Sequence, residues 1–310
     1  MEVLEGIFSI SILSRTLNLA MPLILAGLGG MFSERSGVIN IALEGKMLMG
    51  AFVAVVASYF TGNPWLGVLA AALVGAIVGL LHAWLSIDMK ANQVVSATAV
   101  NILAVGITNV LLLAIWHQPG ASPLVDRIYP IRVPLLADLP VVGVLFESQN
   151  LLAYAGLALV PVTYFVLFRT PWGLRVRAVG EHPRAADTVG VNVRRMRYMS
   201  VIISGMLAGL GGAYLSVAQL AVFTKQMTAG RGFIALGAMI FGKWRPWGVL
   251  GACLLFGFAD AVQLVLQAQG VPIPSQILRG LPYVFAMIAL ASFVGKAVAP
   301  AAIGQPYEVG

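Results

Sequence analysis

Polar side chains recur at helical spacing inside apolar stretches of this sequence. Asp260, Gln263 and Gln267 are three and four residues apart, and Thr98 and Asn101 repeat the three-residue interval. Residues at these intervals share one face of an α-helix. Inside a membrane such groups hydrogen-bond to another helix or contact a polar solute. For Thr98 and Asn101 helix–helix contact is the simpler interpretation, whereas the mid-helix carboxylate of Asp260 requires a partner.

A second group of charged residues, Glu34, Arg35, Glu44 and Lys46, falls between two apolar stretches. Ionisable residues near membrane depth are rare, and they usually face protein or water. Two glycines in the same stretch permit a kinked or re-entrant backbone. Taken alone, these residues fit either a short surface loop with ion pairs or a broken segment beside a polar space.

The composition restricts the environment of the chain. Of its 310 residues, 59% are hydrophobic and only 10% are charged, and the mean hydropathy is +0.91. A soluble domain carries about 25% charged residues. So few charges exclude a soluble enzyme, a nucleic-acid-binding protein and a disordered chain, and they predict a protein of the cell membrane. One cysteine and three scattered histidines do not form a zinc motif, so no metal site is expected.

The apolar residues are grouped into segments of membrane-spanning length. A membrane helix needs about 20 mostly apolar residues, and a shorter ninth stretch, Gly232–Phe241, suits half of a broken helix. The expected fold is all-α, a polytopic membrane helical bundle of about 8–10 segments in one domain, 1–310. The full-length candidates are Ile7–Met31, Ile41–Phe60, Trp65–Ile87, Val94–Trp116, Leu151–Phe168, Met199–Leu220, Trp247–Gln267 and Gln276–Val294.

The basic residues are concentrated in one segment, Arg169–Arg197, which holds seven arginines and two acidic residues. A basic segment in an apolar chain is typical of a cytoplasmic loop. Alternation of the spans then places 118–150 and the N-terminus outside. If the ninth stretch crosses, the C-terminus lies inside. Pro183 suits the first turn of a helix, so a short helix is expected over Pro183–Val189, ending at Gly190.

Part of the sequence repeats. Leu25–Gly30 recurs letter for letter as Leu207–Gly212, and Ile41–Leu43 recurs as Ile234–Leu236. In the expected topology, Leu25–Gly30 and Leu207–Gly212 cross the membrane in opposite directions, which is the pattern of an inverted repeat in transporters. Chance is the alternative, since the chain has 34 glycines. Two Gly-x-x-x-Gly pairs, Gly75/Gly79 and Gly205/Gly209, predict closely packed helices.

Three motifs carry a resemblance to a known family. They are Phe32–Gly45 (FSERSGVINIALEG), Arg177–Ala186 (RAVGEHPRAA), and Thr228–Leu236 (TAGRGFIAL) followed by Phe241–Pro246 (FGKWRP). With them, nearly the whole chain, from about Leu25 to Phe293, resembles the membrane-spanning subunits of ABC importers of the branched-chain amino acid, ribose and nucleoside group. The spelling is nearer to the nucleoside branch.

The resemblance implies partners and a division of labour. Such a subunit pairs with a second, related permease, and this chain resembles the shorter partner of a heterodimer. The pair lies between an extracytoplasmic solute-binding protein and two ATP-binding cassette subunits. ATP and Mg²⁺ are bound by those ATPase subunits, so this chain is expected to hold no cofactor and to be no enzyme itself. As the composition already indicates, no nucleic-acid partner is expected.

The resemblance also assigns sites within the chain. The segment 169–197 corresponds to the cytoplasmic coupling loop, which transmits the movement of the ATPases to the helices. The segments Glu34–Gly45 and Gly230–Phe241 correspond to broken membrane segments near the translocation pathway, which adds Glu34, Asn40, Glu44 and Arg231 to the pathway. The coupling residues carried over are Gly180, Glu181, Pro183, Arg184, Ala185, Ala186 and Gly190.

The resulting functional hypothesis is nucleoside import by alternating access. A nucleoside is polar, uncharged and partly apolar, so helical phase makes Thr98, Asn101, Gln263 and Gln267 candidate pathway residues together with Asp260. The same importer with a flavin, a purine base or a sugar is the first alternative. An ion-coupled secondary transporter using Asp260 is the second. An intramembrane enzyme is the third, although no convincing nucleophile and base are present.

Overall fold

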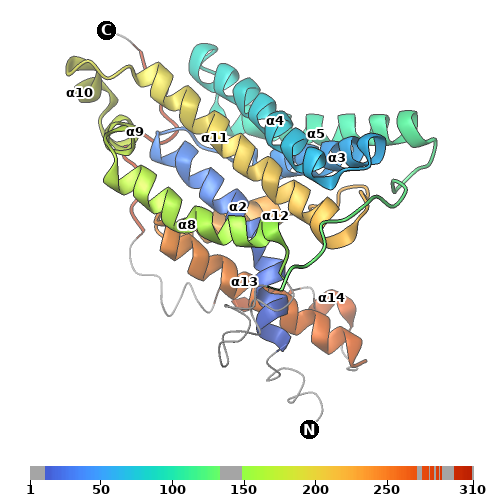
Figure 1. Ribbon diagram of the computed structural model, residues 1–310. Helices are drawn as coiled ribbons and strands as arrows, with labels where there is room; N and C mark the ends of the chain where they lie inside the picture. Colours follow the sequence, from blue (N-terminus) through green and yellow to red (C-terminus); the bar gives the residue numbers. More distant parts are fainter. Residues whose placement is uncertain are drawn as a thin grey trace.

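The chain folds as a bundle of helices crossed at its centre by α2 (Figure 1). The structure, a computed structural model, describes residues 11–132, 149–270, 274–278, 280–282, 284, 285, 287 and 297–308. Within these residues seven helices are long and apolar enough to cross a membrane. The chain is a polytopic all-α membrane protein, as its composition predicts.

The helices follow the predicted spans closely for most of the chain. The short predicted segment becomes α12, and most of the predicted span Gln276–Val294 lies outside the described residues. The elements are α2 (Ser11–Arg35), α3 (Leu43–Thr61), α4 (Pro64–Ala83) continued by the π-helical η1 (Trp84–Asp88), α5 (Gln93–Trp116), α8 (Leu151–Arg169), α9 (Pro171–Glu181), α10 (Pro183–Thr188), α11 (Val193–Ala213) continued by η2 (Tyr214–Leu220), α12 (Arg231–Phe241), α13 (Pro246–Ala268) and α14 (Ser275–Leu278).

Two predicted boundaries are wrong, because both helices continue across charged residues that an apolar segment excludes. Helix α2 continues through Glu34 and Arg35, which therefore belong to a helix rather than to a loop. Helix α11 begins at Val193, well before the predicted Met199, because Asn192 caps its first turn by accepting a hydrogen bond from Arg195 N (2.8 Å). An apolar-run criterion cannot extend a helix across charges whose partners lie elsewhere in the fold.

Different segments of the chain meet at the two ends of the bundle. At the arginine-rich end, which carries α9 and α10, Lys90 pairs with Glu308 near the C-terminus (2.7 Å). At the opposite end, Ser58 Oγ donates to the carbonyl oxygen of Asp126, in the chain that follows α5 (3.4 Å). The described C-terminal residues, 297–308, thus lie at the same end as the basic segment.

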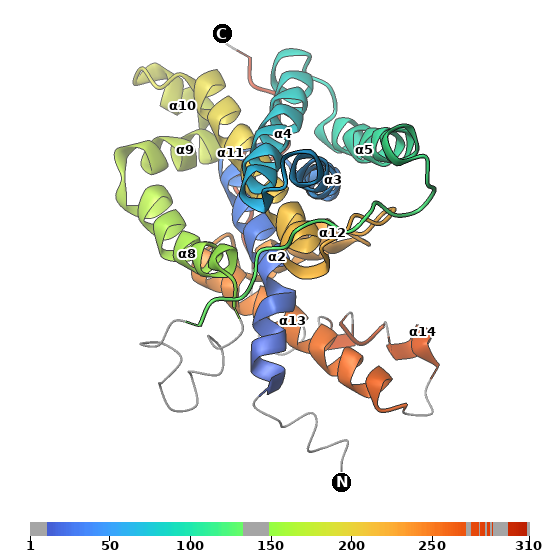
Figure 2. The same cartoon turned by 45° about the vertical axis from the view of Figure 1, so that its right-hand side comes forward.

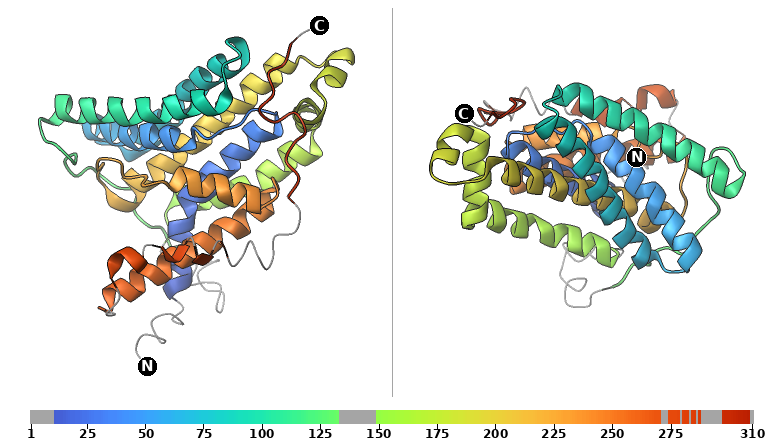
Figure 3. Two further views of the ribbon diagram at one scale, coloured as in Figure 1. Left: turned by 180° about the vertical axis from the view of Figure 1, so that it is seen from behind. Right: turned by 90° about the horizontal axis from the view of Figure 1, so that it is seen from above.

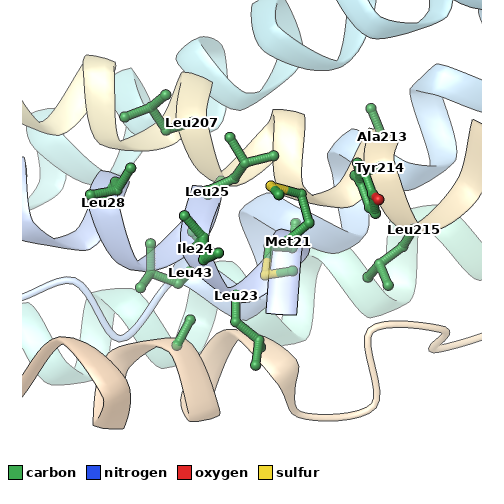
Figure 4. Close-up of a cluster of buried hydrophobic side chains, with 14 of the residues drawn as sticks. Met21, Leu23, Ile24, Leu25, Leu28, Leu43, Leu207, Ala213, Tyr214 and Leu215 are labelled. Carbon is green, nitrogen blue, oxygen red and sulfur yellow. The ribbon is translucent and has the colours of Figure 1, made fainter. Parts of the chain in front are cut away.

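The hydrophobic core is built around α2. In its most apolar part 89% of the residues are buried, against 22% for α5. Figure 4 shows Met21, Ile24 and Leu28 of α2 packed beside Leu43 of α3 and Leu207 of α11. Helix α5 instead leaves most of its apolar surface uncovered by this chain.

The copies of the repeated sequence pack against each other where α2 crosses α11. A Cβ on Gly29 would lie 2.7 Å from the carbonyl oxygen of Ser204, and one on Gly211 would lie 2.9 Å from that of Pro22. Since the higher number in α2 faces the lower number in α11, the copies run antiparallel, as an inverted repeat requires.

The two Gly-x-x-x-Gly pairs also meet, at the contact of α4 with α11. A Cβ on Gly75 would overlap the carbonyl oxygen of Gly205, and a Cβ on Gly205 would overlap that of Gly75. Backbones can come this close only without side chains, and small residues drive helix packing in lipid. The predicted close packing is confirmed.

Gly75→Ala should therefore destabilise the protein, because its methyl group must push α4 away from α11. We expect a loss of about 1–3 kcal/mol, seen as a lower unfolding temperature in detergent. Gly106→Ala in α5 is the matched control, because no described atom lies within 4 Å of its Cβ position. The control should match the wild type or slightly exceed it, since alanine favours a helix. Equal unfolding temperatures for the two variants would contradict the close contact.

Candidate functional site

A cavity of about 450 Å³ opens on one flank of the bundle, where α3 and α12 begin. Figure 2 shows α3, α5 and α12 together on that flank. Small-molecule sites typically have volumes of about 300–1,000 Å³. The walls come from the start of α3, from α5, and from the start of α12 with the loop before it: Glu44, Gly45, Leu48, Asn101, Ile102, Val105, Gln226, Thr228, Ala229, Gly230 and Phe233.

Glu44 is the one charged residue among the described residues that line the cavity, and its charge is already matched. Its Oε1 accepts hydrogen bonds from Thr228 Oγ1 (2.6 Å) and Gly230 N (2.9 Å), and its Oε2 accepts one from Gly232 N (2.7 Å). The first N–H groups of a helix have no partner within it and carry the positive end of its dipole. Glu44 therefore caps α12 and leaves the cavity without an unmatched charge.

Asn101 forms hydrogen bonds with backbone groups at the start of α3. Its Oδ1 accepts from Gly45 N (2.8 Å), and its Nδ2 donates to the carbonyl oxygen of Ile41 (3.1 Å). One side chain from α5 thus satisfies backbone groups on both sides of the point where α3 begins.

The loop between η2 and α12 is strained. Ala221, Gln226 and Ala229 have φ angles of +56°, +55° and +46°, which are rare for residues with a Cβ. The loop is anchored to the opposite end of the bundle, where Lys225 N donates to the carbonyl oxygen of Gly120 (2.7 Å). Strained backbone of this kind clusters at functional sites.

Asn40, predicted on the pathway, lies in the interior with Lys46. Both side chains are fully buried. Lys46 Nζ donates to Asn40 Oδ1 (2.6 Å), and Asn40 Nδ2 donates to Ser204 Oγ (2.5 Å). His82 Nε2 lies 3.0 Å from the carbonyl oxygen of Ile39, next to Asn40 in the chain. These bonds attach the link between α2 and α3 to α4 and α11.

Glu34, also predicted on the pathway, holds the loop between α12 and α13. It is 4% exposed, and its Oε2 accepts a hydrogen bond from Trp244 Nε1 (2.7 Å). The next residue, Arg35, donates from Nη2 to the carbonyl oxygen of Trp244 (3.0 Å). The last turn of α2 therefore binds both the side chain and the backbone of Trp244. We refer to these three residues as the Trp244 clasp.

The remaining predicted pathway residues do not line the cavity. Thr98 is on α5, one turn before Asn101, where it is exposed and donates to the carbonyl oxygen of Val94 within its own helix (2.9 Å). The stripe of Asp260, Gln263 and Gln267 lies on α13, which contributes no residue to the cavity wall described above. Arg231, at the start of α12, attracts the Asp260 carboxylate.

The basic segment forms two helices at the arginine-rich end. The predicted short helix is present as α10, Pro183–Thr188, and Gly190 follows with a left-handed φ of +82°. Helix α9 before it packs flush on the end of α2, because a Cβ on Gly180 would overlap the carbonyl oxygen of Arg35. Within α10, Ala186 is buried, whereas Arg184 and Ala185 are exposed, as is Glu181 at the end of α9.

A C-terminal tail, residues 297–308, covers this junction and was not predicted from the sequence. Figure 3 shows it running beside α9 and α10. Ala302 N donates to the carbonyl oxygen of Gly180 (2.9 Å), and Gly304 N donates to that of Gly37 (3.0 Å). Ala301 N donates to Glu181 Oε2 (3.1 Å). The tail thus connects α9 to the link between α2 and α3, and no motif in its sequence indicates this.

Two polar contacts at the end of the tail remain in their bonded forms at neutral pH. The hydrogen bond that Tyr307 donates to Asp187 raises the pKa of the Tyr307 hydroxyl, which stays protonated. Hydrogen bonding by Lys90 lowers the pKa of Glu308, which stays charged. A carboxylate with a lowered pKa contributes stability above its unfolded pKa and loses it as pH falls, so acid weakens this contact.

Comparison with known proteins gives a consistent family. The family of branched-chain amino acid transport system permease components matches residues 12–291. Two guanosine ABC transporter permeases of Bacillus subtilis are similar to the chain. NupQ is 44% identical and covers 96% of this chain and 97% of its own, and NupP is 29% identical and covers 86% and 78%.

Two further permeases are similar over most of the chain. The nucleoside ABC transporter permease NupC of Lactococcus lactis is 42% identical and covers 96% of both chains. The "Putative glucose ABC transporter permease protein TsgC13" of Haloferax volcanii is 40% identical and covers 88% of this chain and 83% of its own.

Glu44→Gln should loosen the start of α12, because the amide places N–H donors opposite the N–H and hydroxyl donors that the carboxylate now satisfies. Loss of a helix cap costs about 0.5–2 kcal/mol. We expect faster hydrogen exchange at Gly230–Gly232, measured by mass spectrometry, with unchanged exchange in α13. Glu308→Gln at the exposed tail is the control and should leave α12 unchanged. Unaltered exchange at α12 in Glu44→Gln would show that the cap is dispensable.

Proposed function

Because the chain belongs to the family of branched-chain amino acid transport system permease components, we propose that it is a membrane-spanning subunit of an ATP-driven nucleoside importer in the cytoplasmic membrane. The observation that carries the proposal is the similarity to guanosine and nucleoside permeases over 96% of the chain. The cavity supports it, since amides, a hydroxyl and an aromatic ring without an unmatched charge suit a neutral solute with an apolar base.

The proposed importer contains further chains. Two ATPase subunits bind at the arginine-rich end, and a solute-binding protein delivers solute at the opposite end. A second, related permease completes a heterodimer, as the presence of both NupQ and NupP in Bacillus subtilis suggests. The exposed flank of α5, beside which the cavity opens, is the surface that this permease would cover.

A continuous set of contacts leads from the coupling helices to the cavity. Helix α9 rests on Arg35 at the end of α2. Arg35 and its neighbour Glu34 hold Trp244, which follows α12. The other end of α12 is capped by Glu44 in the cavity wall. Movement of α9 and α10 by the ATPases would therefore shift α12 and change the cavity, which is the displacement that alternating access needs.

The nucleoside assignment is tested by uptake of labelled guanosine in cells with and without this gene. We expect uptake to require the gene and ATP, and unlabelled nucleosides to compete more effectively than glucose. The similarity to a glucose permease makes a sugar the second candidate. Effective competition by glucose would make a sugar the assigned solute in place of a nucleoside. Uptake that survives ATP depletion but stops when the proton gradient is dissipated would contradict an ATP-driven importer.

The coupling path is tested at the Trp244 clasp. Trp244→Phe removes the N–H that satisfies the buried Glu34 carboxylate, so α2 should lose its side-chain contact with the α12–α13 loop and keep only the hydrogen bond from Arg35 to the carbonyl oxygen of residue 244. We expect guanosine uptake to fall at least about tenfold, the equivalent of about 1.4 kcal/mol, while the complete complex still hydrolyses ATP. Trp247→Phe, at a tryptophan that is 55% exposed, is the matched control. Proportional loss of ATP hydrolysis and uptake would contradict a coupling role.

A further inference from the structure

Two side chains on the rim of the cavity are not used to hold the fold. Phe233, in the first turn of α12, leaves 48% of its surface exposed. Gln226 is exposed in the strained loop, and its amide has no hydrogen bond to any group in the described part of the chain. A free primary amide offers two donors and one acceptor.

The loop that places these two side chains in one cavity wall has a strained backbone. Gln226 stands at a φ of +55°, and the loop that carries it ends in the three hydrogen bonds to Glu44. Phe233 follows directly, with its N–H bonded to the carbonyl oxygen of Gly230 (3.0 Å). Glu44 therefore fixes both rim residues from the same point.

Phe233 shares the cavity wall with the polar side chains of Glu44, Asn101 and Thr228, which lie among mostly apolar residues. Because Glu44 is fully engaged by α12, the wall offers no free charge to bind a charged solute. An exposed ring with an unpaired amide beside it instead matches a flat, uncharged heteroaromatic group.

We propose that Phe233 and Gln226 bind the base of the transported nucleoside, Phe233 by stacking on its face and Gln226 by hydrogen bonding to its edge. This inference rests on the proposed nucleoside transport. Stacking of a base on an aromatic side chain depends on the π-face and tolerates different bases, whereas an amide can distinguish their edges. The rim would thus accept several nucleosides with unequal preference.

Photolabelling with 8-azidoguanosine tests the proposal on the complete transporter in membranes. We expect the label on peptides covering residues 224–233, with protection by unlabelled guanosine and none by ribose. Phe233→Leu should raise the guanosine concentration that half protects by about 5- to 150-fold, the range expected for loss of base stacking. Phe233→Tyr should restore protection. Phe165→Leu, at a phenylalanine on α8 that is 60% exposed, is the matched control.

Several outcomes would overturn the rim assignment. Label located elsewhere, or equal protection of wild type, Phe233→Leu and Phe165→Leu, would show that the ring faces lipid or the second permease. Failure of Phe233→Tyr to restore protection would assign Phe233 a packing role. If wild-type cells show no gene-dependent guanosine uptake, the proposed function itself fails. Uptake by the wild type without labelling of the rim overturns only the rim assignment.

Discussion

Lipid provides no hydrogen bonds, so each place where this chain interrupts a membrane helix must satisfy its own backbone groups. The Glu44 carboxylate meets that requirement at the start of α12 by accepting hydrogen bonds from two backbone N–H groups, and Asn101 accepts one at the start of α3. Both side chains lie in the wall of the same cavity. The two helix starts can therefore face a solute space with these backbone donors satisfied.

The same constraint explains why movement at one end could reach the cavity. The buried Glu34 carboxylate accepts a hydrogen bond from the Trp244 side chain. Arg35 donates a hydrogen bond to the backbone carbonyl oxygen of Trp244. A buried carboxylate that loses its donor pays a large desolvation cost, so α2 and the end of α12 should move together. The C-terminal tail adds backbone hydrogen bonds to Gly180 and Gly37 on the same junction.

Much of this arrangement is predictable from the sequence, because it depends on local patterns. Apolar runs locate most helices, Pro183 and Gly190 bound α10, and the copies Leu25–Gly30 and Leu207–Gly212 indicate the antiparallel pairing. Contacts between distant residues cannot be predicted in this way. The burial of Glu34 against Trp244, 210 positions away in the chain, has no local signal. The rim residues Gln226 and Phe233 carry no spacing signal, because an irregular loop brings them together.

Cysteine accessibility tests most directly whether the cavity is a pathway whose opening ATP controls. The single native cysteine, Cys253, is fully buried, so a cysteine introduced at the exposed Ala229 would report alone on the cavity wall. In the complete transporter, the account predicts that a membrane-impermeant thiol reagent labels Ala229→Cys at different rates with and without a non-hydrolysable ATP analogue, and that guanosine slows labelling. A rate unaffected by either nucleotide or nucleoside would contradict the account.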